Sequence, residues 1–142
     1  MTIKEKHVAP RVVSRYPLAF EVYSRVLSGL MMLLGLRQWA VIMGIMASAG
    51  GMFEAMSTPW QVATMHLAVV DLVAAVGLWM RVSWGNVIWI YAALSEIALH
   101  TVFIGTFGSD LAVVAFHLVT LAVFGALFYL SRRAEAEEAA RS

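Results

Sequence analysis

The sequence predicts an all-α membrane protein whose four transmembrane helices form an up-down bundle with both termini in the cytoplasm. Hydrophobic residues make up 61% of the 142 residues and charged residues only 13%, whereas soluble domains are about 45–50% apolar and about 25% charged. The apolar residues gather in four segments, each close to the ~20 residues that cross the hydrocarbon core of a bilayer. The distribution of Lys and Arg along the chain predicts how the spans are oriented in the membrane.

The four expected spans follow one another with turns between them. They are residues 26–48, 61–80, 86–106 and 111–130. The first connection, 47–60, is rich in Gly and small polar residues, and the turns at 81–86 and 106–110 each contain Gly, which is typical of loops. Because the last two connections are short, we expect the second, third and fourth spans to be antiparallel neighbours.

The positive charges predict which side of the membrane each connection faces. Five Lys or Arg lie in residues 1–25, one in the turn 81–86 and three in residues 132–142, whereas 47–60 and 106–110 have none. The cationic connections all fall at one end of an up-down bundle, which the positive-inside rule makes cytoplasmic. We therefore expect a multi-pass protein of the bacterial inner membrane. We expect it to have three parts. Residues 1–25 form a cytoplasmic or interfacial segment, residues 26–131 form the transmembrane domain, and residues 132–142 form a charged cytoplasmic tail.

Charge and cysteine content exclude several functions. The net charge is only +1, so nothing in the bulk charge indicates a nucleic-acid partner. The chain has no cysteine, which excludes disulfide exchange, thiolate catalysis and cysteine-based metal sites. The expected partners are membrane lipids, with other membrane proteins or further copies of the chain as additional possibilities.

Three charged residues lie near the middle of the expected spans: Arg37, Asp71 and Glu96. One charge at a helix centre costs about 2.5–3.5 kcal/mol, so three that faced lipid would cost on the order of 10 kcal/mol. We therefore expect them to face one another, with Asp71 paired to Arg37, whose planar guanidinium suits a carboxylate. The second carboxyl group is then expected to be protonated, because a low dielectric and a like charge both favour its neutral form.

Three histidines, His66, His100 and His117, lie on three different expected spans at about the same depth. Three at one depth could bind a metal, and two on facing helices could bind haem. The spacing of Glu96 and His100 is Glu-x-x-x-His, which differs from the Glu-x-x-His pattern of di-iron carboxylate proteins. The polar residues allow three interpretations: a structural set that fixes helix register, a proton- or ligand-handling site, and a metal or haem site. The leading expectation is that the chain has no cofactor, with haem or a metal as the alternative.

Two segments carry a resemblance to a known family. RVLSGLMMLLGL (25–36) and DLVAAVGLWMRVSWGNVIW (71–89) resemble the DoxX-like family of small four-helix bacterial membrane proteins. The shared features are an Arg before a glycine-bearing first span and an acid several residues ahead of the Gly-Leu that ends the second span. A narrower resemblance, in GLWMRVSWGNVIW, is to an uncharacterised alphaproteobacterial family of about this length.

The resemblance implies a fold more than an activity. DoxX-like proteins have been linked to quinone-coupled sulfur oxidation and to oxidative-stress complexes, but many members have no assigned activity. The wider group is also similar to the vitamin K epoxide reductase bundle, an enzyme that needs a Cys-x-x-Cys pair. This chain has no cysteine, so that chemistry is ruled out, and the resemblance transfers no catalytic residue.

The expected function is that of a small inner-membrane protein that serves as an accessory or scaffold component of a membrane complex, without catalysis of its own. One alternative is a redox-linked protein that binds quinone or haem through His66, His100 and His117. A second alternative is a proton-coupled carrier in which Arg37, Asp71 and Glu96 form the relay. Whether the chain is an enzyme stays open, and its catalytic residues, if it has any, are unknown.

Overall fold

The computed structural model describes residues 16–141, so most of the expected N-terminal segment lies outside the described residues. Within that range the regular structure is helical, without a strand, and a single bridge joins Ser48 to Gly51. The helices, in chain order, are α1 (Tyr16–Ile42), the short 3-10 helix η1 (Phe53–Ala55), α2 (Thr58–Met80), α3 (Ser83–Thr101), α4 (Ile104–Phe107) and α5 (Leu111–Arg141).

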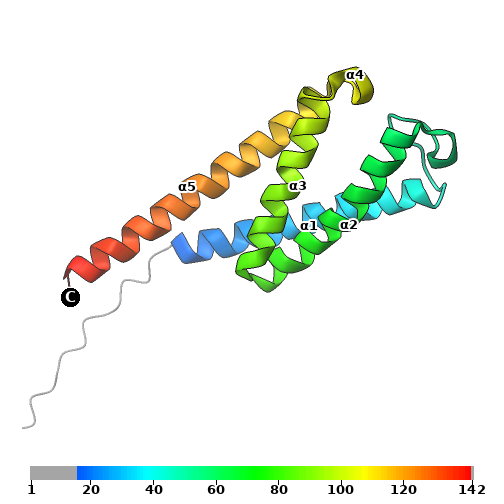
Figure 1. Ribbon diagram of the computed structural model, residues 1–142. Helices are drawn as coiled ribbons and strands as arrows, with labels where there is room; N and C mark the ends of the chain where they lie inside the picture. The colour runs from blue at the N-terminus through cyan, green and yellow to red at the C-terminus, as the bar shows by residue number, and fades with distance from the viewer. Residues whose placement is uncertain (1–15, 142) are drawn as a thin grey trace, which may run out of the picture.

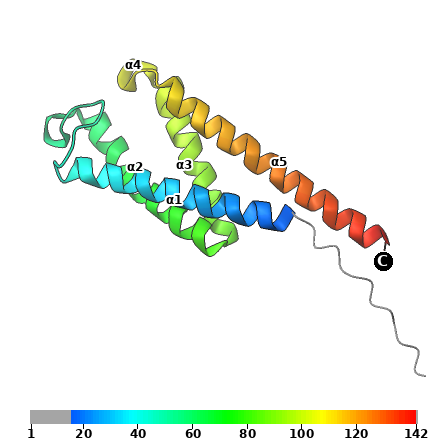
Figure 2. The ribbon, with the colours of Figure 1, turned by 180° about the vertical axis from the view of Figure 1, so that it is seen from behind.

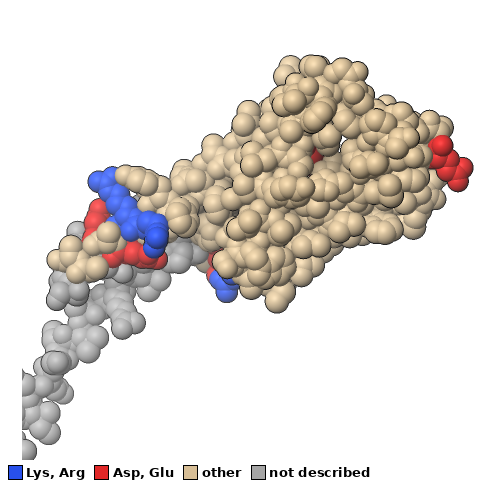
Figure 3. Space-filling view, in the orientation of Figure 1, with Lys and Arg blue, Asp and Glu red and all other residues tan. Residues whose placement is uncertain are grey.

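The long helices run back and forth, as an up-down order requires. Figure 1 shows α1 and α2 packed along each other, α3 turning away from the end of α2, and α5 returning from the short α4. The start of α1 and the end of α5 lie at the same end of the molecule in both Figure 1 and Figure 2. Most charged side chains on the face drawn in Figure 3 lie toward its two ends, and the surface between them is almost free of charge.

Among the described residues, three helices are long and apolar enough to cross a membrane. They are Leu18–Ile42, Thr58–Met80 and Leu111–Glu137. The remaining long helix, α3, has 19 residues and is about 28 Å long at 1.5 Å per residue. It carries polar residues such as Ser95, Glu96 and His100 and is not among the three helices that meet both conditions. The chain is thus helical and, by the length and composition of these three helices, compatible with a membrane; a crossing by α3 stays a prediction.

The first span does not end where the sequence led us to expect. We expected it to run to residue 48, but α1 ends at Ile42. Gly44 follows with a φ of +72°, a left-handed conformation that side chains with a Cβ rarely adopt and that stops the helix. At the other end α1 continues through residue 25, and α5 runs without a break into the charged tail. The domain boundaries expected at these two points therefore fall inside helices.

Hydrogen bonds and small residues fix α1 on α2. Ser24 and Ser28 of α1 donate to the carbonyl oxygens of Leu78 and Ala75 of α2, at 3.0 Å and 2.7 Å. Trp39 donates its indole N–H to the carbonyl of Ala68 at 3.2 Å. In lipid, helices associate through close packing and such polar contacts, because lipid tails are as apolar as the side chains. These contacts set the register of the two helices.

Two glycines bring α2 and α3 into backbone contact. A Cβ atom on Gly77 would collide with the Cα of Gly85, and a Cβ on Gly85 would collide with the Gly77 backbone. Arg81 closes the turn between them with a φ of 56°. The buried residues around this contact include Leu27, Met31, Ala74, Ala75, Leu78, Trp89 and Ala92. The core of the molecule is therefore built from α1, α2 and α3, and α5 packs against it with one side.

Candidate functional site

Asp71 is fully buried, but it does not pair with Arg37. The Asp71 side chain has no exposed surface, and neither carboxyl oxygen has a hydrogen-bond partner among the described residues. Arg37 is exposed. The predicted ion pair between these two residues is therefore wrong.

The rotational setting of α1 explains the correction. Ser24, Ser28 and Gly35 face α2, where a Cβ on Gly35 would lie 2.8 Å from the side chain of Leu72. Arg37 comes two residues after Gly35, which is about 200° around an α-helix. Arg37 is thus turned away from the part of α1 that lies against Leu72, the residue next to Asp71 in the sequence.

The structure instead joins Glu96 of α3 to His117 of α5. Glu96 Oε2 lies 3.1 Å from His117 Nε2. His117 is fully buried and Glu96 is 8% exposed. The two groups are close enough for an electrostatic interaction, but no hydrogen bond joins them, since neither ring nitrogen of His117 has a hydrogen-bond partner among the described residues.

This pair was missed because Glu96 and His117 were assigned to two different groups. A signal was available in the chain. Glu96 lies five residues before the end of α3 at Thr101, and His117 lies six residues after the start of α5 at Leu111. Two antiparallel helices place residues at equal distances from their connection at the same height, so counting outward from the turn would have brought the two together.

The three histidines occupy separate environments. The His66 ring meets the Tyr91 ring edge to face at 5.5 Å, and His100 Nδ1 lies 3.3 Å from the carbonyl oxygen of Gly108. His117 contacts Glu96. Within residues 16–141, no group of three or more His, Asp or Glu is placed to hold a metal ion. The common histidine layer expected from the sequence is therefore not formed, because each ring faces a different helix contact.

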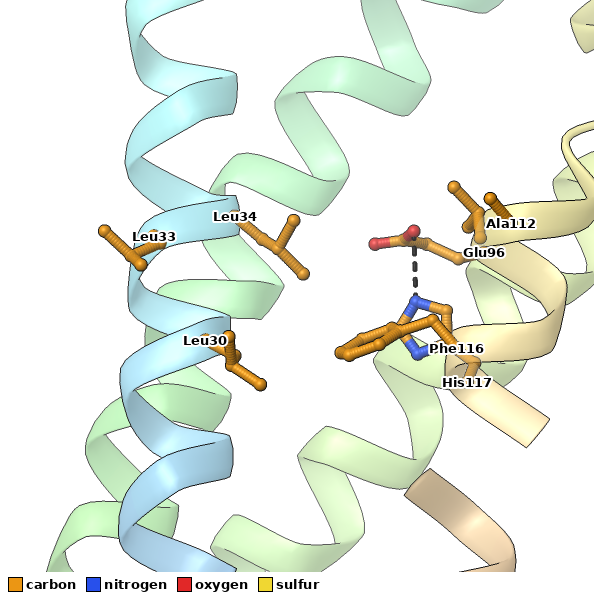
Figure 4. Close-up of a pocket in the computed structure, with 8 residues that line it drawn as sticks. Leu30, Leu33, Leu34, Glu96, Ala112, Phe116 and His117 are labelled. Carbon is orange, nitrogen blue, oxygen red and sulfur yellow. Dashed lines mark ion pairs between the residues drawn. The ribbon is translucent and has the colours of Figure 1, made fainter. Parts of the chain in front are cut away.

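An apolar groove opens beside the Glu96–His117 pair. The groove has a volume of about 340 Å³ and lies between α1, α3 and α5 (Figure 4). Its lining consists of Leu30, Leu33, Leu34, Glu96, Ala112, Val113, Phe116 and His117. We call it the α1–α5 groove. Leu33 is 65% exposed, so the groove opens onto the apolar surface of the molecule.

The Glu96–His117 pair forms the polar floor of the α1–α5 groove. In Figure 4 the Glu96 carboxyl group extends into the space between the helices, with one oxygen toward His117 and the other on the side of Leu34. His117 Nδ1 has no hydrogen-bond partner among the residues that the structure describes. The site therefore combines apolar walls with one accessible carboxyl group.

A second, smaller cavity reaches Glu96 from the loop end of the bundle. This loop-end cavity has a volume of about 110 Å³, and its polar lining includes Arg37, Thr64, His100 and Asp110. Glu96 is the ionisable residue that lines both cavities. Figure 3 shows acidic atoms at the bottom of a hollow in the otherwise uncharged face. The carboxyl group of Glu96 thus connects a polar cavity with a groove on the apolar surface.

Comparison with known proteins assigns a family without a function. No curated protein and no solved structure matches the chain. The resemblance to DoxX-like proteins finds no support in these comparisons and stays a prediction, whereas the expectation of a family without an assigned activity agrees with the match that was found. The model of the family of unknown function DUF6163 matches residues 18–135, which is most of the chain, and the chain therefore belongs to the DUF6163 family.

Proposed function

We propose that this protein binds a lipid-soluble molecule in the α1–α5 groove and serves as a non-catalytic accessory component of a complex in the bacterial inner membrane. The observation that carries the proposal is the Glu96–His117 pair, 3.1 Å apart, at the floor of a groove that opens onto the apolar surface. An ionisable residue at membrane depth is costly and commonly marks a functional site.

The dimensions and the lining of the groove suit a small ligand. Ligand pockets are typically ~300–1,000 Å³ and mostly apolar, with a few polar groups that orient the ligand. The α1–α5 groove, at about 340 Å³, lies at the small end of this range. Leucines and Phe116 form its walls, and Glu96 and His117 supply the polar contacts. A molecule could enter sideways from the bilayer, because the wall formed by α1 is exposed.

The proposed membrane arrangement has four crossings, with α3 as the third and with both termini in the cytoplasm. Arg81, in the turn between α2 and α3, contacts Glu21 near the start of α1 at 3.3 Å. Arg25 lies over the ring of Trp79 at 4.4 Å, at the same end of the bundle. These contacts, together with Arg132 and Arg133 of α5, support a single cationic end, which the positive-inside rule makes cytoplasmic.

The proposed partners are membrane lipids and other membrane proteins, and the protein supplies or holds a ligand for them. The alternative in which haem or quinone is bound by the three histidines together lacks a common site, since His66, His100 and His117 face different contacts. The alternative of a proton-coupled carrier remains compatible with the position of Glu96, which lines both cavities.

A groove-filling substitution tests the proposal. Ala112 lines the groove, whereas Ala115 is exposed on α5 outside both cavities. We expect a lipid-soluble molecule to co-purify with the wild-type protein and with Ala115→Trp, and to be lost from Ala112→Trp. Native mass spectrometry and solvent extraction measure the bound molecule. Equal occupancy in the two tryptophan variants, or a wild-type protein that binds no such molecule, would refute the proposal.

A further inference from the structure

We propose that the molecule held in the α1–α5 groove is a hydrophobic cation, which exchanges with a proton at Glu96. This inference rests on the proposed function, because it names the chemical class of the ligand for the same groove. Three observations lead to it: the charges inside the bundle, the chemistry of the groove walls and the access to Glu96 from two sides.

The interior of the bundle has more acidic groups than basic ones. Asp71 and Glu96 are buried and near enough to interact electrostatically. In the part of the chain that the structure describes, neither forms an ion pair with a Lys or Arg, and the one partner is His117 beside Glu96. A buried carboxylate without a cation is strongly disfavoured. The negative charge must therefore be cancelled by a proton, held on the carboxyl group itself or on His117 beside Glu96, or by a bound cation.

The other ionisable groups around Glu96 do not supply that cation. Arg37 of α1 and His100 of α3 line the loop-end cavity together with Glu96, but Arg37 is exposed and makes no ion pair with it. Asp110, at the start of α5, accepts hydrogen bonds from the backbone N–H groups of Ala112 and Val113 at 3.0 Å and 3.2 Å. Asp71 of α2 adds a second acid. Apart from a proton held by the Glu96–His117 pair, the position of a compensating cation next to Glu96 is thus open to a ligand.

The groove walls favour an organic cation over a metal ion. Hard cations such as Na⁺ and Ca²⁺ are bound by several oxygen ligands, and the α1–α5 groove offers one carboxyl group among leucine, alanine, valine and phenylalanine side chains. Such walls bind alkyl and aryl groups. The ring of Phe116 adds an aromatic surface, and cations are attracted to aromatic faces. An ammonium or phosphonium ion with apolar substituents matches both the walls and the floor.

The second cavity provides a route for the proton that the cation replaces. Glu96 lines the loop-end cavity as well as the groove, so a proton can leave or reach its carboxyl group through the polar side while the ligand enters from the lipid side. Each binding event exchanges one cation for one proton of the Glu96–His117 pair, so the charge of the carboxyl group is compensated in both states. The proton and the cation therefore compete for one site, and cation binding must weaken as the pH falls.

Calorimetry with matched probes tests the inference. The purified full-length protein in a neutral detergent is titrated with tetraphenylphosphonium, with tetraphenylborate, an anion of nearly the same shape, and with neutral triphenylphosphine oxide. We expect tetraphenylphosphonium to bind best, with release of about one proton, and its affinity to fall by up to about tenfold for each unit by which the pH is lowered, because one proton competes for the site. Glu96→Gln is expected to weaken binding by at least about tenfold. The control Glu54→Gln, at an exposed acid outside both cavities, is expected to bind as the wild type does.

The outcomes separate the two proposals. If the neutral probe or the anion binds as tightly as the cation, or if no proton is released, the ligand is not an exchanging cation, although groove binding stands. If no probe binds but a lipid-soluble molecule co-purifies and is lost in Ala112→Trp, the cation inference again falls alone. If no probe binds and nothing co-purifies, both proposals fall. If Glu96→Gln fails to fold, the test does not depend on it. Binding of the three probes to the wild type and to Ala112→Trp still shows whether the groove is the binding site. Proton release by the wild type still shows whether the ligand exchanges with a proton.

Discussion

His117 and Glu96 join α5 to α3 inside the bundle, with 3.1 Å between Nε2 and Oε2. Elsewhere α5 has few polar contacts with the core; one is the hydroxyl group of Tyr23 on α1, which donates to the carbonyl oxygen of Thr120 at 2.6 Å. Much of the remaining apolar surface of α5 is exposed, as at Leu118 and Phe128. Because lipid solvates such a surface well, polar contacts have a large share in holding α5 in place.

We predict that removing one partner of this pair destabilises the protein and that removing both restores part of the loss. His117→Leu leaves the Glu96 carboxyl group without its buried partner, which costs about 1–3 kcal/mol for an unsatisfied polar group. The double variant Glu96→Leu/His117→Leu has no orphan group and should recover much of this free energy of unfolding. Folded fraction against temperature in detergent measures both. A double variant that is no more stable than the weaker single variant would show that the two residues do not interact.

A second prediction concerns Arg37, which the sequence had paired with Asp71. Because Arg37 is exposed and Asp71 has no hydrogen-bond partner, Arg37→Gln should change the free energy of unfolding by no more than about 0.5 kcal/mol, as is usual for surface substitutions. Asp71→Asn, which removes a buried acid without changing its size, should be neutral or stabilising. Thermal unfolding of the two variants is the measurement. If each variant instead lost about 3–5 kcal/mol of its free energy of unfolding, the usual cost of breaking a buried ion pair, Arg37 and Asp71 would have to be paired after all.

The helices were largely predictable from the sequence, and the contacts between their side chains were not. Apolar runs and glycine-rich turns located α2 and α5, since length and composition determine whether a segment can lie in lipid. The partner of Asp71 depended instead on the rotation of α1. Gly35 lies against Leu72 of α2, whereas Arg37, two residues later, is exposed. A largely apolar helix gives no clear hydrophobic stripe from which that rotation could be deduced.

A third prediction tests the contact between α2 and α3. Gly77→Ala and Gly85→Ala would each drive a Cβ atom into the opposite backbone, which forces the helices apart and should cost more than about 2 kcal/mol, within the upper range for overpacked cores. The matched control is Gly125→Ala on α5, where a Cβ atom meets nothing within 4 Å. Because Ala is the better helix former by ~0.5–1 kcal/mol, this variant should be at least as stable as wild type. Tolerance of Ala at position 77 or 85 would contradict the close approach of the two helices.

The last prediction decides whether α3 crosses the membrane. With four crossings, reporters after Ser142 and after Arg81 are both cytoplasmic, and reporters near Gly51 and Gly108 are both outside. If α3 lay along the surface, the three remaining spans would keep Gly51 outside and Arg81 inside, but Gly108 would be inside and the reporter after Ser142 outside. The reporters at Gly108 and Ser142 are therefore the informative ones.

We expect the four-crossing result, because Arg132 and Arg133 follow the apolar part of α5 and positive charge is retained on the cytoplasmic side. Replacing both arginines with glutamine should weaken this preference, whereas Arg37→Gln, inside the apolar part of α1, should leave it unchanged. A reporter after Ser142 that faces outward in the wild type would reduce the bundle to three spans and would place Glu96 near the membrane surface, where the lipid-side entry proposed for the groove no longer holds.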